Sequence, residues 1–517
     1  MVDGLHSRVV KYILALLAIV VGGVCLFMVS SFGVRLTPDI LVLIKETNMV
    51  ELGDFFTMYL SSSQNLLYLA LGTVVFLGYY FCDKLYAEKF FKTGFSRKST
   101  VAVFALFCLS VCATAYAQLN IYPFIRPQNQ SIYYAYGSDS ATNLGLCAYW
   151  LNQSDKNFDE AVAVTMKAVA RPVACQDVDS VDLILVIGES YIKSHAGIYG
   201  YRLNTTPCME QEMNRGNLFA FDDVLSPNYY TSMAVKNIMS TNSVGAGEQW
   251  FQSPFFPALF KKAGYRVFLW ENQRDWAKTA IHSRMTSVLF NVDLARMSYS
   301  GSNTRCFEYD EGLISDFCNR LPQLEGRNLI VFHLRGQHFM TDARFPHTPQ
   351  HVRFHASDIV RKEPYIGPVQ KQYIADYDNA TLYNDYVIGK IMDSFRQRNA
   401  VMIYMSDHGE EVFDYRNNKG RRYNTKDYKN QYKYYNEVPY VVWCSPAYAA
   451  LHPDRMERIR QSLHVKFMTD VTSQLFFYLG GLKTPYYVPQ RNPLLPEFSP
   501  VKRLINDHCD YDRLRVQ

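Results

Sequence analysis

One stretch of nine residues constrains the fold more than any other part of the chain. It reads Asp-Leu-Ile-Leu-Val-Ile-Gly-Glu-Ser over 182–190, an apolar run that stops at a glycine and a carboxylate. A continuous run of Leu, Ile and Val without polar alternation is typical of a strand buried on both faces, as in the centre of a parallel sheet. Ligands of open α/β sheets bind outside the carboxyl ends of the strands. The run therefore predicts a central strand with Glu189 at its ligand-binding end; the alternative for Glu189 is an acidic N-cap of a following helix.

Strand-like runs and helical patterns alternate over residues 179–517. We predict strands at 183–187, 266–270, 328–333, 401–405 and 438–443, and helices near 232–240, 254–263, 371–398 and 453–478. This alternation is typical of an α/β domain with a central, mostly parallel sheet flanked by helices. Residues 179–517 are therefore the predicted functional domain, preceded by a polar linker over 121–178.

Three long segments near the N-terminus carry no charged residue. They lie between Lys11 and Arg35, between Asp54 and Asp83, and between Lys98 and Arg126. Each holds an apolar stretch of about 17 residues or more, which is long enough to cross a bilayer as a helix. We therefore predict transmembrane helices at roughly 12–33, 64–82 and 100–119, within a membrane anchor formed by residues 1–120. A cleaved signal peptide is the alternative for the first of them.

The segments around these predicted spans differ in charge. The loop over 83–98 and the residues before the first span are basic, whereas acidic residues outnumber basic ones over 35–54. Basic loops stay in the cytoplasm, so the chain after about residue 120 is expected on the outer side of the membrane. The stretch over 40–60 is apolar but interrupted by charges, which favours a helix lying at the membrane surface.

The cysteines give a further expectation. The chain has 11 of them and no C-x-x-C pair, which argues against a zinc site built from thiolates. Disulfides are the usual state of cysteines in an exported domain. We predict one bridge between Cys306 and Cys318 and another between Cys147 and Cys175.

A second strand-end motif is similar to the first. The apolar run over 401–405 is followed by Ser-Asp-His-Gly, which places Asp407 and His408 directly after a predicted strand. Adjacent carboxylate and imidazole groups can ligate one metal ion, and Glu189 would supply a third ligand. Three protein ligands leave one position open, as in zinc sites that catalyse hydrolysis or group transfer.

A candidate nucleophile lies between the two motifs in the sequence. Thr231 and Ser232 precede a helix-compatible segment, so a hydroxyl would stand at a helix N-terminus, where anions bind. A metal-activated threonine there could attack phosphorus. Taken alone, Thr-Ser before a helix is typical of an N-cap.

In their order, these motifs resemble those of the membrane-anchored phosphoethanolamine transferases of Gram-negative envelopes, members of the alkaline phosphatase and sulfatase superfamily. The resemblance rests on Gly188-Glu189-Ser190, Tyr199-Gly200-Tyr201, Asn204 to Pro207, Thr231, His333-x-x-Gly336-x-His338, Tyr377-Asp378-Asn379 and Ser406 to Glu410. It covers roughly residues 180–480 and the hydrophobic N-terminus. It implies that Glu189, Thr231, Asp407 and His408 ligate zinc, as one or two ions, with Thr231 as the nucleophile that becomes phosphoethanolaminylated.

The resemblance also implies a reaction and a location. Phosphoethanolamine would move from phosphatidylethanolamine to an envelope glycolipid, either lipid A or the lipopolysaccharide core. The enzyme would lie in the bacterial inner membrane with its catalytic domain in the periplasm, and no nucleic acid is expected as a partner. The alternatives are a lipoteichoic-acid-type glycerophosphotransferase or a phosphodiesterase of the same superfamily, and a non-catalytic envelope scaffold.

The chain departs from the family pattern at two places. Members that modify lipid A carry Ser-His-Gly-Pro where this chain has Gln-His-Phe-Met over 337–340, and His338 is the residue expected to contact the transferred phosphoryl group. Members also carry a histidine about a dozen residues after the Asp-His pair, where this chain reads Asn-Lys-Gly-Arg-Arg over 418–422. A lysine or arginine there could stabilise charge but is a poor general acid at neutral pH. The other expected substrate-binding residues are Asn272, His333 and Lys278.

Overall fold

The computed structural model describes residues 140–516, apart from 177–178, 274–287, 321, 323, 423–426 and 507–508, together with some residues between 12 and 81. The chain divides into two compact units, one of residues 1–41 and 55–150 and one of residues 42–54 and 151–517. Within the described residues, no helix has both the length and the apolar character needed to cross a membrane. The predicted helices at 100–119 and 40–60 lie outside the described residues. Only parts of the predicted spans at 12–33 and 64–82 are described, and those parts are helical.

The second unit is built on a seven-stranded mixed sheet with the strand order β3-β11-β8-β2-β7-β5-β6. The strands are β2 (Asp182–Gly188), β3 (Leu218–Phe221), β5 (Arg266–Glu271), β6 (Gly301–Ser302), β7 (Asn328–His333), β8 (Ala400–Ser406) and β11 (Tyr440–Cys444). Strands β8, β2, β7, β5 and β6 pair in parallel, and β11 pairs antiparallel with both β8 and β3. All five predicted strands are confirmed, and the apolar run over 182–188 forms the middle strand.

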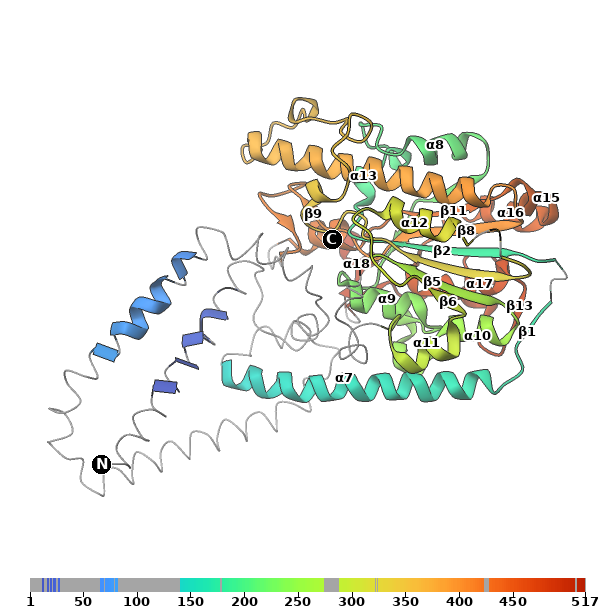
Figure 1. The fold of residues 1–517 in the computed structure, drawn as a ribbon, viewed down its shortest axis with the longest axis horizontal. Coiled ribbons are helices and arrows are strands. Elements are labelled where there is room, and N and C mark those ends of the chain that lie inside the picture. Colours follow the sequence, from blue (N-terminus) through green and yellow to red (C-terminus); the bar gives the residue numbers. More distant parts are fainter. Residues whose placement is uncertain are drawn as a thin grey trace, which may run out of the picture. The chain divides into compact units, whose positions relative to one another are not determined.

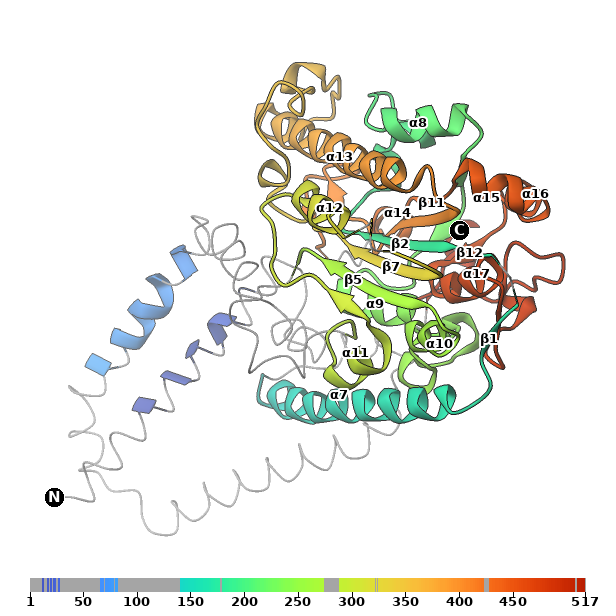
Figure 2. The same ribbon diagram turned by 45° about the vertical axis from the view of Figure 1, so that its right-hand side comes forward.

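Strand β2 is buried on both faces because helices cover both sides of the sheet. The helices are α7 (Ser140–Val169), α8 (Pro207–Asn214), α9 (Thr231–Met239), α10 (Phe256–Lys262), α11 (Val292–Ser298), α12 (Asp310–Cys318), α13 (Pro368–Phe395), α14 (Tyr428–Asn436), α15 (Pro446–Leu451), α16 (Pro453–Gln461), α17 (Thr472–Leu479) and α18 (Tyr511–Val516). Helices α8, α12 and α13 lie on one side, and α9, α10 and α11 on the other (Figures 1 and 2). Leu183 and Leu185 belong to one hydrophobic core, whereas Ile184 and Val186 belong to the other. This is the alternation that a strand imposes on its side chains.

The single helix predicted over 453–478 is wrong, because two helices occupy this stretch. Helix α16 ends at Gln461, and strand β12 (Phe467–Met468) then pairs in parallel with β4 (Val224–Leu225) before α17 begins. Phe467 packs edge-on against Phe221 and Tyr440. A buried Phe467 fits the apolar pattern of a helix as well as that of a strand. Periodicity in the sequence therefore does not show that the helix stops before residue 467.

Helix α7 covers much of the stretch predicted as a linker. In its second half, Phe158, Ala161 and Ala168 are buried in the hydrophobic core that also contains residues of α9 and α10. The hydroxyl of Thr165 accepts a hydrogen bond from the backbone amide of Phe255 at 3.0 Å. The second half of α7 is therefore packed as part of the sheet domain.

The predicted disulfide between Cys306 and Cys318 is wrong. Cys318 ends α12 as a free thiol, and its Sγ lies 3.2 Å from Ser394 Oγ on α13. Cys306 lies in the segment between β6 and α12 and is not bonded to Cys318. In the second predicted pair, Cys175 donates its thiol to the carbonyl of Gly480 at 3.3 Å, and the side chain of Cys147 lies outside the described residues.

Candidate active site

Two adjacent strand ends bring the predicted metal ligands together. Strands β2 and β8 pair so that Gly188 lies opposite Ser406, and the next residues are Glu189 on one strand and Asp407 and His408 on the other. These three side chains are fully buried. One ligand atom from each lies within 4.8 Å of the others. The spacing is that of a three-residue metal site.

The threonine hydroxyl lies against this cluster. Thr231 is the first residue of α9, and its Oγ1 is 3.0 Å from Glu189 Oε2 and 3.1 Å from His408 Nε2. The N-cap of α9 is Tyr230, which makes no side-chain capping bond. Glu189 does not cap a helix either, because the next helical turn begins only at Lys193. The two alternatives from the sequence, in which Thr231 or Glu189 serves only as a helix N-cap, are therefore excluded.

The backbone around Glu189 is held in an unusual conformation. Ser190 has a positive φ of 57°, and its side chain donates to Glu189 Oε1 at 2.8 Å while its amide donates to Asp407 Oδ1 at 3.2 Å. Gly336 has a φ of +50°, and a Cβ placed on it would lie 2.8 Å from the amide nitrogen of Glu189. Positive φ is rare for a residue with a side chain, and such strain is concentrated at functional sites.

The two carboxylates of the cluster, Glu189 and Asp407, have shifted pKa values in the protein without a metal ion. Burial and the neighbouring Glu189 raise the pKa of Asp407 well above its usual value. Burial would also raise the pKa of Glu189, but His408, His338 and Arg421 together outweigh burial and hold that pKa well below its usual value. Within the described residues, Asp407 Oδ2 is buried and accepts no hydrogen bond. A buried oxygen of this kind costs about 1–3 kcal/mol, and a cation bound beside it would remove that cost.

The donor set fits a divalent metal ion. His408 Nδ1 lies 3.0 Å from the carbonyl of Gly409, which favours a proton on Nδ1 and leaves the Nε2 lone pair directed at the cluster. His408 Nε2 is 3.2 Å from both Glu189 Oε1 and Asp407 Oδ2. Two carboxylates, one imidazole and a hydroxyl are ligands that zinc accepts.

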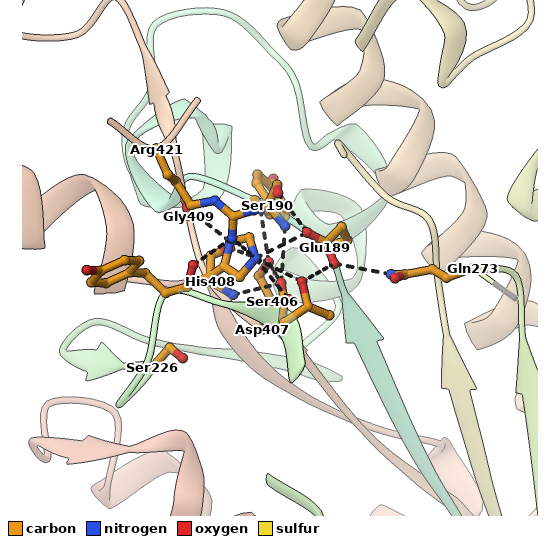
Figure 3. A network of polar contacts seen from close by, with 12 residues as sticks. Glu189, Ser190, Ser226, Gln273, Ser406, Asp407, His408, Gly409 and Arg421 are labelled. Atoms are coloured by element: carbon orange, nitrogen blue, oxygen red, sulfur yellow. Dashed lines mark hydrogen bonds and ion pairs between the residues drawn. The ribbon is translucent and has the colours of Figure 1, made fainter. Parts of the chain in front are cut away.

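Two further residues contact the cluster: Gln273 was not predicted from the sequence, and Arg421 was predicted only as one of the basic residues of the 418–422 segment that could stabilise charge. Gln273 donates to Glu189 Oε2 at 3.2 Å and to the carbonyl of Leu334 at 2.7 Å. Arg421 reaches His408 from the opposite side (Figure 3). Gln273 follows the carboxyl end of β5, and this position is the signal that could have identified it. Arg421 falls in the segment where the family pattern has a histidine.

Of the other residues expected to bind substrate, His338 lies near the cluster, whereas Lys278 is not described. Burial, together with Arg344 and Arg421, lowers the pKa of His338 to about 3 despite the nearby Glu189, so this side chain is neutral beside the cluster. Lys278 lies outside the described residues.

Asn272 and His333 contact residues of the sheet domain. The side-chain amide of Asn272 donates to Asp310 Oδ1 at 2.9 Å, and its oxygen accepts from the backbone amide of Phe307 at 2.6 Å. These two hydrogen bonds hold the side chain in place. His333 is buried beside Glu271, with Nδ1 3.7 Å from its carboxylate. The contacts described for these two side chains are therefore with the protein around the sheet, and their role in substrate binding stays a prediction.

Comparison with known proteins identifies the family. Residues 182–475 match the sulfatase family, and residues 5–146 match the N-terminal domain of phosphoethanolamine transferases EptA/EptB. Phosphoethanolamine transferase EptC of Escherichia coli is 27% identical over 341 residues, which are 64% of this chain and 57% of that protein. The Kdo(2)-lipid A phosphoethanolamine 7''-transferase of Salmonella typhimurium is 26% identical over 329 residues, 62% of this chain and 55% of that protein. The chain thus spans little more than half the length of these relatives.

Solved structures show the same fold. The C-terminal periplasmic domain of E. coli EptC has a TM-score of 0.57 at 25% identity, over 66% of this chain and 95% of that one. A structure of that domain in complex with Zn has a TM-score of 0.55 at 24% identity, with the same coverage. The integral membrane protein EptA of Neisseria meningitidis has a TM-score of 0.65 at 18% identity, over 94% of this chain and 87% of that one. The chain therefore belongs to the sulfatase family, and its N-terminal segment is similar to the phosphoethanolamine transferases EptA/EptB.

Proposed function

We propose that this protein transfers phosphoethanolamine from phosphatidylethanolamine to lipid A or to the lipopolysaccharide core, with Thr231 as the nucleophile. The observation that carries the proposal is the position of the Thr231 hydroxyl, 3.0 Å from Glu189 and 3.1 Å from His408 at the start of α9. The first amides of a helix have no partner within the helix, and the helix dipole favours negative charge there. A phosphodiester brought to this point meets both the nucleophile and an environment that stabilises its charge.

The proposed cofactor is zinc, in one or two ions, held by Glu189, Asp407, His408 and Thr231. Zinc bound there lowers the pKa of a hydroxyl and polarises a phosphoryl oxygen. The residues of the chain supply the rest. Glu189 and Asp407 would hold the metal beside the hydroxyl, Gln273 fixes the carboxylate of Glu189, and α9 presents Thr231 at its N-terminus.

The proposed reaction has two halves. In the first, the bond from Thr231 Oγ to phosphorus forms as the bond from phosphorus to the diacylglycerol oxygen breaks; the proton that threonine loses is balanced by the one that diacylglycerol gains. In the second, a hydroxyl or phosphate oxygen of the glycolipid takes the place of diacylglycerol and releases Thr231. Because the two lipids use the same site in turn, the first half does not require the acceptor.

The proposed location follows from the donor, which is a membrane lipid. Residues 1–120 would anchor the chain in the inner membrane, residues 121–178 would connect the anchor to the catalytic domain, and residues 179–517 would work in the periplasm. The match of residues 5–146 to a transferase N-terminal domain and the charge-free segments of the sequence support this arrangement.

The test is the mass of the full-length protein in detergent after incubation with phosphatidylethanolamine and zinc, without acceptor. We expect a phosphoethanolamine adduct that disappears when envelope glycolipid is added. A phosphoglycerol adduct formed only with phosphatidylglycerol would instead indicate a glycerophosphotransferase, and release of phosphoethanolamine into water would indicate a phosphodiesterase. No adduct and no turnover with either lipid would indicate a scaffold.

A further inference from the structure

The side chain of Arg421 is held at the centre of the candidate site by three contacts. Its Nη1 lies against Nε2 of His408 and 3.1 Å from Nδ1 of the same ring. The same Nη1 donates to the carbonyl of Tyr229 at 2.6 Å, and the guanidinium lies 5.7 Å from the centre of the Tyr230 ring. Tyr229 and Tyr230 directly precede Thr231, so two of these contacts hold the guanidinium beside the proposed nucleophile.

A short hairpin carries Arg421 back to this position after the chain has left His408. Strands β9 (Glu411–Val412) and β10 (Lys419–Gly420) pair antiparallel, with Gly420 opposite Glu411. Gly420 has a φ of +75°, a conformation that glycine adopts without strain, and the next residue is Arg421. The backbone pairing of β9 with β10 therefore fixes where the chain places Arg421.

Arg421 and a metal ion compete for one atom. A neutral imidazole with its proton on Nδ1 has a single lone pair on Nε2, and that lone pair either accepts the guanidinium N–H or binds a metal. A metal ion held by His408 Nε2 would therefore displace the guanidinium from this nitrogen. Its contacts with Tyr229 and Tyr230 do not depend on His408 and can keep it within reach of the Thr231 hydroxyl.

We infer that Arg421 binds the phosphodiester of the donor lipid and of the covalent intermediate, once a metal ion has taken His408 Nε2. The guanidinium then faces the oxygens of the phosphoryl group at Thr231, which its planar fork of N–H groups matches in geometry and charge. The inference rests on the proposed role of Thr231. Arg421 makes and breaks no covalent bond and transfers no proton. It stabilises charge as the phosphoryl group passes from diacylglycerol to threonine, as arginines do in other phosphoryl transfers.

The inference gives Arg421 a different role from that of a cation that only balances the buried carboxylates. A cation that only balances the carboxylates repels a metal ion, so its removal would leave zinc binding unchanged or tighter and would leave binding of the head group unchanged. A phosphodiester ligand that competes with the metal would also leave zinc binding unchanged or tighter on removal, but its loss would weaken binding of the head group. The two roles therefore differ in the affinity of the zinc-loaded protein for the head group.

The test uses the full-length protein in detergent and the variants Arg421→Gln, Arg421→Lys and Arg422→Gln. Arg422 is the exposed neighbour, so its variant is a matched control for charge at the same place in the chain. Three quantities are measured: zinc affinity, the affinity of the zinc-loaded protein for glycerophosphoethanolamine, and the rate at which the Thr231 adduct forms from phosphatidylethanolamine.

We expect Arg421→Gln to bind zinc at least as tightly as the wild type, to bind glycerophosphoethanolamine about 10-fold more weakly or worse, and to form the adduct about 100-fold more slowly. Arg421→Lys, which keeps the charge but loses the fork, should fall between, and Arg422→Gln should match the wild type. Unchanged binding of glycerophosphoethanolamine by zinc-loaded Arg421→Gln would overturn the inference.

The outcomes also separate this inference from the proposed function. If the wild type forms no adduct, the transferase proposal fails, and the head-group affinity of Arg421→Gln still decides whether Arg421 binds a phosphodiester. If the wild type forms the adduct and Arg421→Gln forms it at the same rate, the transferase proposal stands and the role of Arg421 is refuted.

Discussion

The ring of His195 bridges two buried carboxylates, with Nδ1 2.7 Å from Asp378 Oδ1 and Nε2 3.0 Å from Asp414 Oδ1. Asp378 lies on α13, and Asp414 lies in the hairpin segment between His408 and Arg421. Both ring nitrogens donate, so this histidine carries a proton on each. The bridge fastens the segment that follows the candidate metal ligands Asp407 and His408 to α13, the longest helix on that side of the sheet.

The first prediction concerns this bridge. Burial alone would lower the pKa of His195, but Asp414 and Asp378 raise it to about 10, above its unfolded value near 6.5. The stabilisation is therefore complete below about pH 6.5 and is lost as the pH rises toward 10. We expect His195→Gln to lower the free energy of unfolding by about 3–5 kcal/mol near pH 6, because it leaves two carboxylates buried without their partner.

The measurement is chemical unfolding of both proteins at several pH values. The difference between wild type and His195→Gln should shrink between pH 7 and pH 10. His464→Gln is the control, because His464 forms an exposed pair with Asp222 whose loss should change stability little. A difference that stays constant over this pH range would show that the bridge is not ionic.

The second prediction concerns Gly336, which lies against the backbone of Glu189. Gly336→Ala would bring a Cβ to 2.8 Å from the Glu189 nitrogen and 2.9 Å from its oxygen, at a φ of +50°. We expect a loss of stability of about 2–4 kcal/mol and weaker zinc binding, because the carboxylate must move. Gly326→Ala separates the two causes: Gly326 has a φ of +65° but open space around it, so it should cost only about 1–2 kcal/mol and leave zinc binding intact. Equal effects of the two substitutions would contradict the steric argument.

The third prediction concerns the nucleophile. Thr231→Ala should abolish the covalent adduct and reduce transfer by about 1,000-fold or more without unfolding the protein. Ser232 is turned by about 100° around the helix, so Ser232→Ala should keep much of the activity. Thr231→Ser keeps the hydroxyl but loses the methyl group that restricts χ1, and it should show reduced but measurable transfer. Peptide mapping by mass spectrometry decides the matter, and an adduct on Ser232 or Ser226 would refute the assignment.

The fourth prediction concerns the metal. The purified protein should contain zinc, and Asp407→Ala and His408→Ala should each lose most of it while the sheet domain stays folded, because the core does not depend on a closed ligand shell. Asp293→Ala removes an exposed carboxylate far along the chain from the cluster and should leave the zinc content unchanged. Elemental analysis after gel filtration measures this. Full zinc content in both cluster variants would place the metal elsewhere.

The fifth prediction concerns topology. A reporter fused after residue 90 should report the cytoplasm, and one fused after residue 130 should report the periplasm, because the loop over 83–98 is basic. Alkaline phosphatase and green fluorescent protein give opposite signals on the two sides and serve as each other's control. If both fusions report the same compartment, the three-span arrangement is wrong.

Much of the sheet could be predicted because its central strands are buried on both faces and appear as continuous apolar runs. Strands β3 and β6 were not predicted, since β3 has four residues and β6 has two, too few to form a pattern. The end of helix α16 was missed because Phe467 is equally well buried in a helix or a strand. The disulfide between Cys306 and Cys318 was predicted from their proximity in sequence, and α12 turns Cys318 toward Ser394 instead.

The candidate site was predictable to a similar degree. Glu189, Asp407 and His408 could be placed because each directly follows a recognisable strand. The neighbouring positions of β2 and β8 in the sheet, which bring these residues into contact, have no signature in a single sequence. Gln273 enters the site from an irregular segment whose path depends on packing, and the hairpin that brings Arg421 back to His408 has strands of only two residues, too short to be recognised in the sequence.

The pairing of β2 with β8 has a consequence for how the protein folds. The hydrogen bond from the amide of Ser190 to Asp407 joins residues that are 217 positions apart in the chain. Contacts at such separation require a long loop to close before they return any stabilisation, and proteins rich in them fold slowly. A growing chain that has passed Ser190 must therefore wait for more than 200 further residues before its central strand acquires a neighbour on that side. During this interval this apolar strand has an unpaired edge, so the period of synthesis is when the protein is most exposed to aggregation and most dependent on chaperones.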